Sequence, residues 1–437
     1  MSPETALTIL LVSFVVLFTV GVPLAMALLF SSVITIAVDP NLSVVVLPQK
    51  IYTGIDNFLL LAIPGFMFAA LMMNKIGVTR DIVRLSDLLV GRIKGGLAHI
   101  NVVSSMLMGG VSGSSTADVA GIGAILIPAM KDKGYSPGFS ASLTAASSSI
   151  GSIIPPSILM VIYGASANVS IGALFIAGYI PGILVGLTQL VIAWYYAHKY
   201  GIDMPSKEKK TRAEKLEILA KGLIPVSVIC VIIGGIMTGV MTATESAAVA
   251  SVYVVFVGAV IYRKMSFAIL MDVAVETALL TAVVMLCVGT ATLFGWLMSF
   301  YGILDVAGNL FETYASSPTI FLIFASILFL LLGTFMDPAP AMLIFVPVLA
   351  SVASTIGADP LQLGILVIMA LAIGKITPPY GISLLLACTI AGIPLTKGLG
   401  WTVVFFGAFC ALMLAIVFFP SITLGLPTLL TPELMGR

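Results

Sequence analysis

The sequence predicts an all-α integral membrane protein built from two inverted repeats, each with five membrane spans and one re-entrant hairpin. Composition is the first reason for this prediction. Of the 437 residues, 60% are apolar and 9% are charged, whereas a soluble globular chain carries roughly 25% charged residues. The other two reasons are apolar stretches of bilayer-spanning length and short motifs that recur in the second half. A soluble fold and a disordered chain are therefore excluded.

Ten apolar stretches are expected to span the membrane, because a spanning helix needs about 20 apolar residues and about 17 can suffice. They lie at 4–20, 23–38, 58–76, 136–166, 170–198, 221–238, 246–262, 277–301, 359–391 and 396–420. The first stretch is not preceded by the basic segment of a cleaved signal peptide. We therefore expect it to remain as a span.

Two further apolar stretches, 97–130 and 319–350, are interrupted by Gly, Ser, Asp and Pro. We predict that each is a re-entrant hairpin, which enters and leaves the membrane on the same side. Non-helical backbone at membrane depth survives only where protein or an aqueous cavity satisfies its hydrogen bonds. The interruptions therefore point to the functional site.

The basic residues predict that both termini lie on the outer side of the membrane. With the N-terminus outside, every Lys and Arg except Lys50, Lys375 and Arg437 falls in a segment on the inside, as the positive-inside rule requires. The highly charged stretch within 199–220 is then a basic cytoplasmic linker between the two repeats.

Motifs repeated at a fixed offset predict the two repeats. GSIIPP at 151–156 recurs as GKITPP at 374–379, an offset of 223 residues, and Asp118 and Asp337 each precede a proline by ten residues. Five crossings are an odd number, so the second copy must lie upside down in the membrane. Such inverted repeats are typical of secondary transporters, which bind their substrate near the membrane midplane between interrupted helices.

Each predicted repeat contains scaffold helices, an amphipathic arm, a hairpin and a broken helix. The first repeat, 1–198, places these parts at 1–76, 78–92, 97–130 and 136–166; after the linker 199–220, the second repeat, 221–437, places them at 221–301, 303–315, 319–350 and 359–391. Two roles for the arms remain open. They could brace a static scaffold while the hairpins move, or lie in the interface without a mechanical role.

The hairpin tips and helix breaks carry the candidate chemistry. The first tip reads GGVSGSSTAD at 109–118 and the first break reads SSSIGSIIPPS at 147–157. Hydroxyl and carbonyl oxygens suit a small hard cation such as Na⁺. A break also exposes carbonyls that carry partial negative charge and N–H groups that carry partial positive charge. We therefore expect a cation near each break and an anionic carboxylate mainly in the hydroxyl-rich first half.

Several of these residues also have structural interpretations. Ser115 and Asp118 have the spacing of a capping box, and Asp337 before Pro338 is a good N-cap; for both aspartates, capping and ion ligation remain open. For Lys375 we favour pairing with Asp337 over reaching the interface or attracting a substrate carboxylate. Thr244, Glu245 and Ser246 are interpreted as a helix cap.

Other functional classes have little support in the sequence. A net charge of +1 gives no nucleic-acid footprint. The four cysteines lie inside apolar runs without metal-ligand spacing, which argues against a zinc site or a disulfide framework. An intramembrane enzyme would have only Asp118 and Asp337 as a carboxylate pair. We therefore expect a transporter subunit rather than an enzyme.

Four motifs together resemble the large membrane subunit of TRAP (tripartite ATP-independent periplasmic) transporters. They are SGSSTAD at 112–118, SIGSIIPPS at 149–157, TESAA at 244–248 and GKITPPYG at 374–381. The resemblance covers essentially the whole chain. It implies an elevator-type fold of the ion-transporter superfamily in a bacterial inner membrane, with both termini periplasmic. It also implies Na⁺-coupled uptake of organic acids, a periplasmic substrate-binding protein and a separate small membrane subunit of four helices.

The same resemblance implies the site residues. Substrate contacts would fall among Ser114, Ser115, Ser148 and Ser149. The Na⁺ sites would involve Ser112, Gly113, Ser114, Ser115, Gly151 and Ile154 in the first half and Gly333, Thr334, Asp337, Gly374 and Thr377 in the second. The cargo could be a C4-dicarboxylate, sialic acid or a keto acid, and no motif chooses among them. A single-chain Na⁺/anion symporter and a passive channel remain alternatives.

Overall fold

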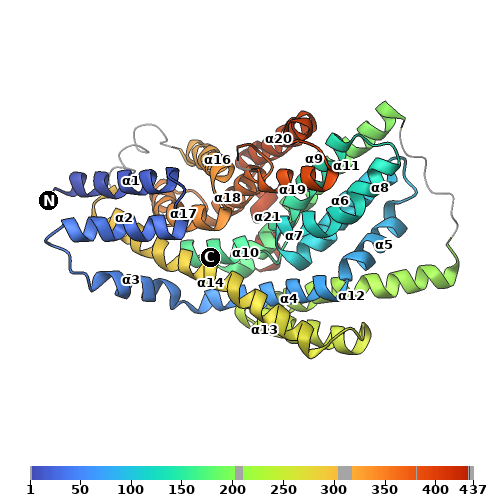
Figure 1. The fold of residues 1–437 in the computed structure, drawn as a ribbon, viewed down its shortest axis with the longest axis horizontal. Coiled ribbons are helices and arrows are strands. Elements are labelled where there is room, and N and C mark those ends of the chain that lie inside the picture. Colours follow the sequence, from blue (N-terminus) through green and yellow to red (C-terminus); the bar gives the residue numbers. More distant parts are fainter. Residues whose placement is uncertain (1, 202–209, 304–316, 380, 432, 434–437) are drawn as a thin grey trace.

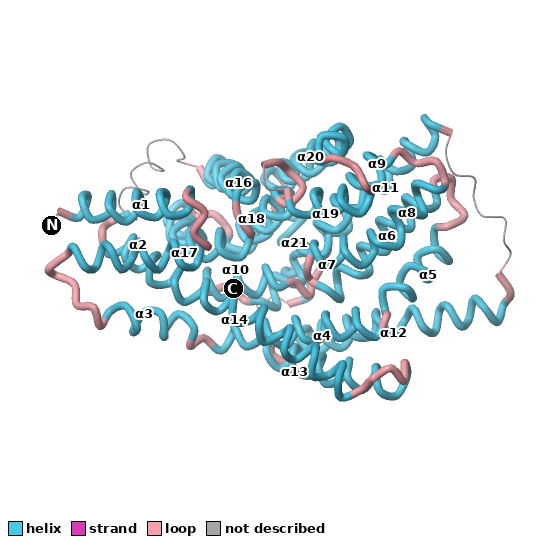
Figure 2. Tube along the Cα trace, in the orientation of Figure 1, coloured by secondary structure: helices cyan, strands magenta, loops and turns pink. Residues whose placement is uncertain are grey.

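The computed structural model describes residues 2–201, 210–303, 317–379, 381–431 and 433, and every regular element in these ranges is a helix (Figure 2). The molecule is elongated. Helices α1 (Pro3–Thr19), α2 (Leu24–Val38) and α3 (Val46–Ile55) lie toward one end, and α5 (Val78–Val90) lies toward the other (Figure 1).

Eight helices of the described ranges are long and apolar enough to cross a membrane. They are Phe58–Ile76, Ile171–Tyr200, Arg212–Met237, Ala243–Ile261, Phe267–Phe300, Pro318–Phe335, Pro338–Ile356 and Leu395–Phe418. The predicted spans at the N-terminus form the shorter apolar helices α1 and α2. The chain is therefore a multi-pass membrane protein.

The scaffold helices pack mainly on one another. Helix α4 (Ala62–Ile76) contacts α13 (Ala243–Phe256), and α14 (Phe267–Phe300) contacts α2, α3 and α4. Helix α14 begins ten residues before the predicted span at 277, because Ser266 accepts a hydrogen bond from the backbone N–H of Ile269 and caps the helix there. The cap of α13 is also earlier than predicted, since Thr242 and Glu245 form a reciprocal capping box.

A second group of helices surrounds the hairpins and breaks. It contains α6 (Gly96–Ser112), α9 (Pro137–Ser148), α16 (Pro318–Phe335), α18 (Pro360–Gly374), α19 (Ile382–Ala391) and α20 (Leu395–Phe418). Helix α18 contacts α16 and α20, and α9 contacts α6, α19 and α20. Every residue of α18 from Leu361 to Gly374 is buried, which explains why its sequence is apolar all round.

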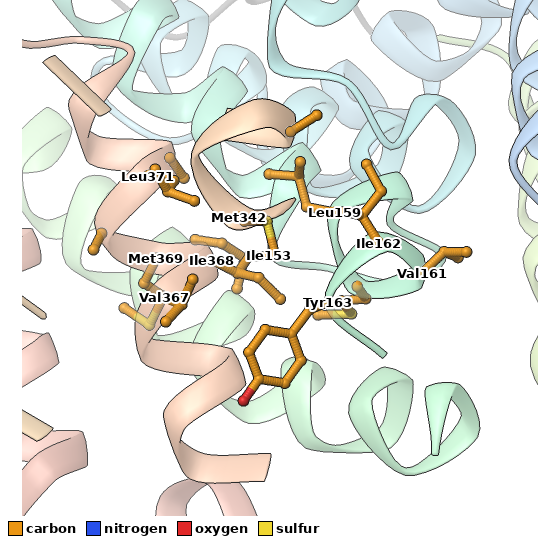
Figure 3. Packing of buried hydrophobic residues seen from close by; sticks show 14 of the residues in the cluster. Ile153, Leu159, Val161, Ile162, Tyr163, Met342, Val367, Ile368, Met369 and Leu371 are labelled. Atoms are coloured by element: carbon orange, nitrogen blue, oxygen red, sulfur yellow. The ribbon is translucent and has the colours of Figure 1, made fainter. Parts of the chain in front are cut away.

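The core of this second group joins the two halves of the chain. Side chains of α10 (Ile158–Ala167), α17 (Pro338–Ile356) and α18 pack together around Tyr163 (Figure 3). The Tyr163 hydroxyl donates to the carbonyl of Pro360 at 2.8 Å. The first broken helix is therefore held directly against the second.

The predicted arm at 78–92 is an amphipathic helix, α5. Val78, Ile82 and Leu85 are buried on one face, and the helix packs on α6 and on α12 (Arg212–Met237). The second predicted arm, 303–315, lies outside the described residues except for its first residue, as does 202–209 of the linker. Helix α21 (Ser421–Leu430), which packs on α11 (Ile171–Tyr200), was not predicted.

Candidate functional site

Each predicted hairpin consists of helices joined by a turn. In the first, α6 ends at Ser112, Gly113 turns the chain with a φ of 57°, and α7 (Ser115–Asp118) begins the return. A π-helical segment, Val119–Gly123, then leads into α8 (Ala124–Asp132). In the second, α16 turns at Met336 and Asp337 into α17. That the hairpins are re-entrant stays a prediction.

Both predicted helix breaks are present. The first separates α9 and the short 3₁₀ segment Ser149–Ser152 from α10, and the second separates α18 from α19. The peptide bonds Pro155–Pro156 and Pro378–Pro379 are both cis. Each break places the C-terminal end of one helix near the N-terminal end of the next.

Glycines bring each hairpin tip against the break of its own half. A Cβ atom added to Gly109 would lie 2.8 Å from the Cα of Gly151. A Cβ atom added to Gly374 would lie 2.4 Å from the carbonyl carbon of Gly333. Backbone meets backbone in both places, which only glycine permits. The tips and breaks therefore form two matching contacts.

A cavity of about 540 Å³ lies where these parts meet the scaffold. Its walls come from the first hairpin tip, the first break, α10, the second hairpin tip, the start of the second break, α4 and α14. Four predicted site residues line it: Ser112, Gly113, Ser114 and Asp337. Volume and mixed apolar and polar lining are those of a small-molecule site.

Nine predicted site residues are not among the residues that line the cavity. They are Ser115, Ser148, Ser149, Gly151, Ile154, Gly333, Thr334, Gly374 and Thr377. Ser148 donates to the carbonyl of Ala145 at 2.7 Å, and Ser149 donates to the carbonyl of Ala372 at 3.2 Å. Both serines are fully buried. The structure therefore places them in the protein core, and neither lines the cavity.

The capping box that was one of two interpretations of Ser115 and Asp118 is not formed. The Ser115 hydroxyl shares a hydrogen bond with the Ser152 hydroxyl at 2.7 Å. Asp118 is 1% exposed, and its Oδ1 accepts from the Ser112 hydroxyl at 2.5 Å. Its Oδ2 is enclosed with no hydrogen-bond partner in the described ranges. Asp118 therefore braces the tip from within rather than capping a helix.

The second tip also differs from its prediction. Asp337 occupies the N-cap position of α17, but its side chain makes no capping hydrogen bond. The described residues contain no ion pair between Lys375 and Asp337 within 4.0 Å. Both side chains instead line the cavity, Lys375 with 8% of its surface exposed and Asp337 exposed. The favoured pairing was therefore wrong.

Sequence reasoning missed two polar residues of the cavity wall, Asn74 and Glu276, and did not single out Thr116 and Ser152 within the predicted first tip and first break. Glu276 lies one residue before the predicted span 277–301, and only the earlier start of α14 at Phe267 places this ionisable residue within an apolar helix. Asn74 gave no such signal, since an uncharged amide within an apolar stretch does not mark a site. In the described part of the chain, no three His, Cys, Asp or Glu side chains group as metal ligands.

Known proteins with similar sequences are transporter permeases. The profile of the family described as "Tripartite ATP-independent periplasmic transporter, DctM component" matches residues 11–422. The sialic acid TRAP transporter large permease protein SiaM of Vibrio cholerae is 38% identical over 413 residues, 94% of this chain and 95% of that protein. The C4-dicarboxylate TRAP transporter large permease protein DctM of Pseudomonas aeruginosa is 34% identical over 397 residues, 91% and 92% of the two chains.

Another relative has no assigned role, and two solved structures share the fold. "Uncharacterized protein YgiK" of Salmonella typhimurium is 37% identical over 424 residues, 96% of this chain and 97% of that protein. The Alcanivorax borkumensis YdaH transporter matches with a TM-score of 0.56 at 14% identity, over 91% of this chain and 97% of that one. Neisseria gonorrhoeae MtrF matches with a TM-score of 0.55 at 14% identity, over 96% and 95%.

At this level of identity the two solved structures establish the fold alone, whereas the sequence relatives establish the family. The match covers nearly the full length of the chain and includes both hairpin tips, both breaks and the cavity. The chain therefore belongs to the DctM component family of the tripartite ATP-independent periplasmic transporters and is a transporter permease, not an enzyme.

Proposed function

We propose that this permease takes up an organic acid anion across the bacterial inner membrane, driven by Na⁺ and by an elevator movement of the hairpin group against the scaffold. The observation that carries the proposal is the cavity of about 540 Å³ between both hairpin tips and the scaffold helices α4 and α14. Relatives are named for sialic acid, C4-dicarboxylates, isethionate and 2,3-diketo-L-gulonate. All of these are organic acids, and a carboxylate is the group we assign to the cavity.

One Na⁺ ion is proposed at each pair of tip and break. The first site draws on Ser112, Gly113, Ser114, Ser115, Gly151 and Ile154, and the second on Gly333, Thr334, Asp337, Gly374 and Thr377. The glycine contacts support this assignment, because they bring the backbone of each tip to the end of a half-helix. Carbonyls at such an end carry partial negative charge.

The inverted-repeat arrangement is part of the proposal, and two observations support it. Gly109 against Gly151 and Gly333 against Gly374 are matching contacts, and the two positions of one pair differ from those of the other by 224 and 223 residues. The Ser149 hydroxyl bonds to the carbonyl of Ala372, again 223 residues away. Equivalent positions touch each other only near a two-fold axis.

Packing that is largely internal to each group supports an elevator movement. The scaffold pairs α4 with α13 and α14 with α2 and α3, and the hairpin group pairs α16 with α18 and α9 with α19 and α20, while α14 also contacts α17 across the boundary between the groups. The cavity lies between the two groups. A substrate bound there would be carried with the hairpin group when it moves against α4 and α14.

Three partners complete the proposed system: the lipid bilayer, a periplasmic substrate-binding protein and a small membrane subunit of four helices. Exposed apolar side chains on α1, α13 and α20 suit lipid or a membrane subunit. The isethionate permease DctMQ of Oleidesulfovibrio alaskensis matches over only 59% of its own length. That relative therefore has room for a second membrane part in the same chain. Both termini of this permease are proposed to be periplasmic.

Uptake by reconstituted proteoliposomes tests the proposal. With both partner proteins present, uptake should follow an inward Na⁺ gradient, accumulate substrate against its own gradient and ignore ATP. Uptake that persists unchanged in K⁺ or choline would refute Na⁺ coupling. Uptake without accumulation would indicate a channel, and full uptake without the small subunit would indicate a single-chain symporter.

A further inference from the structure

We infer that the substrate of this cavity carries one acidic group, held by Lys375, and that Glu276 excludes anions with two acidic groups. The inference rests on the proposed function and narrows it. Its basis is the set of ionisable side chains that line the cavity. In the described part of the chain these are one cation, Lys375, and two carboxylates, Glu276 and Asp337.

Lys375 can bind an anion in the cavity. Only 8% of its surface is exposed, and the residue lines the cavity. No carboxylate lies within 4.0 Å of its ammonium group among the described residues, and no side-chain hydrogen bond of Lys375 is formed with them. The ammonium group is not enclosed by protein, so it can bind an anion in the cavity. An anionic group entering the cavity supplies the missing partner.

Glu276 limits that anion to one acidic group. It reaches the cavity from the scaffold helix α14, whereas Asp337, from the second hairpin tip, belongs to the proposed Na⁺ site and would be offset by that ion. Once Lys375 has bound one acidic group, a second acidic group of the substrate that approaches α14 would meet the like charge of the Glu276 carboxylate.

The uncharged lining fits the rest of such a substrate. Hydroxyls of Ser114, Thr116 and Ser152 and the amide of Asn74 offer hydrogen bonds to hydroxyl or carbonyl groups. The remaining walls on α4, α10 and α14 are apolar. A compact hydroxylated monocarboxylate or monosulfonate matches this lining, whereas a C4-dicarboxylate does not.

Ligand-induced thermal stabilisation of the purified full chain in NaCl tests the inference. The probes are gluconate with one carboxylate, isethionate with one sulfonate, succinate with two carboxylates, and glucose as the uncharged control, all at one ionic strength. Gluconate or isethionate should bind about tenfold or more tighter than succinate. Which of the two binds more tightly identifies the acidic group.

Substitutions test which residues produce the preference for ligands with one acidic group. Lys375→Gln should abolish stabilisation by every anion. Glu276→Gln should narrow the preference for the single-acid probe over succinate. Asp272→Asn is the matched control, because Asp272 lies one turn away on α14, pairs with Lys75 at 4.0 Å and does not line the cavity; it should leave the preference unchanged.

Three outcomes would overturn the inference: succinate as the tightest ligand, no anion that stabilises the wild-type chain, or an unchanged preference in Glu276→Gln. Each is distinguishable from failure of the proposed function. Na⁺-driven uptake in proteoliposomes can persist when the preference is for two acidic groups. Conversely, the single-acid preference can hold while uptake ignores Na⁺.

Discussion

The first break is more enclosed than the second, and Ser152 is its residue that lines the cavity. Every residue from Ser149 to Ser157 is buried. In the second break Thr377 and Pro378 are half-buried, Pro379 is exposed and Lys375 lines the cavity. The two breaks therefore share a backbone arrangement but differ in their surroundings. The first is held by packed protein, and the second places the charge of Lys375 at the cavity.

The glycine contacts give the sharpest test of this difference. Gly374→Ala should destabilise the chain by about 3 kcal/mol, because its new Cβ would meet only backbone atoms of Gly333, the nearest at 2.4 Å. Gly109→Ala should cost less, about 1–2 kcal/mol, since its nearest neighbour lies at 2.8 Å. Thermal unfolding of the purified variants measures both.

Gly407→Ala on α20 is the matched control for these two substitutions. Nothing lies within 4 Å of a Cβ atom at this position. Since alanine favours a helix over glycine, the variant should be as stable as the wild type or slightly more stable. Equal losses in all three variants would show that the tip and break glycines are not close contacts.

Hydroxyl loss at the two hairpin tips should have unequal effects in Na⁺-free buffer. Ser112→Ala removes the only hydrogen bond to the buried Asp118 carboxylate seen in the described ranges and should cost about 1–3 kcal/mol. Thr334→Val removes a hydroxyl that bonds to the Leu331 carbonyl of its own helix at 2.7 Å. That change should cost about 0.5 kcal/mol or less. Similar losses at both tips would contradict the asymmetry.

The smallest expected effect separates two neighbouring serines of the first break. Ser149→Ala removes a hydrogen bond to Ala372 in the second half of the chain and should cost about 1 kcal/mol. Ser148→Ala removes only a bond to Ala145 on its own helix and should be nearly neutral. The same two variants check the prediction that these serines contact substrate. Ligand binding that is lost in Ser148→Ala but not in Lys375→Gln would favour that prediction over the cavity assignment.

The positions of proline and glycine made the hairpins and breaks predictable from the sequence. Two consecutive prolines interrupt a helix, and glycines allow the close backbone contacts between the tips and the breaks. The extension of α14 and the extra helix α21 were missed, because hydropathy reports apolar length and not helix ends. Asn74 and Glu276 were not assigned to the site, since only the folded chain brings α4 and α14 to the tips.

Sequence patterns could not predict the direction in which a side chain points. Ser148 and Ser149 have the residue type of a polar site, but the surrounding helices enclose them. Lys375 lies in the second break and Asp337 at the second hairpin tip. Their charges are opposite, yet the described structure places no ion pair between them. Residue type indicates what a side chain can bind, and only packing decides which partner it reaches.

The central claim is that each tip and its break form one cation site beside a shared substrate cavity. The Na⁺ dependence of initial uptake in proteoliposomes tests it most directly, with Ser115→Ala probing the first site and Thr377→Val the second. Each variant should reach the membrane at the wild-type level and require a higher Na⁺ concentration for half-maximal uptake. An unchanged Na⁺ requirement in both variants would contradict the claim.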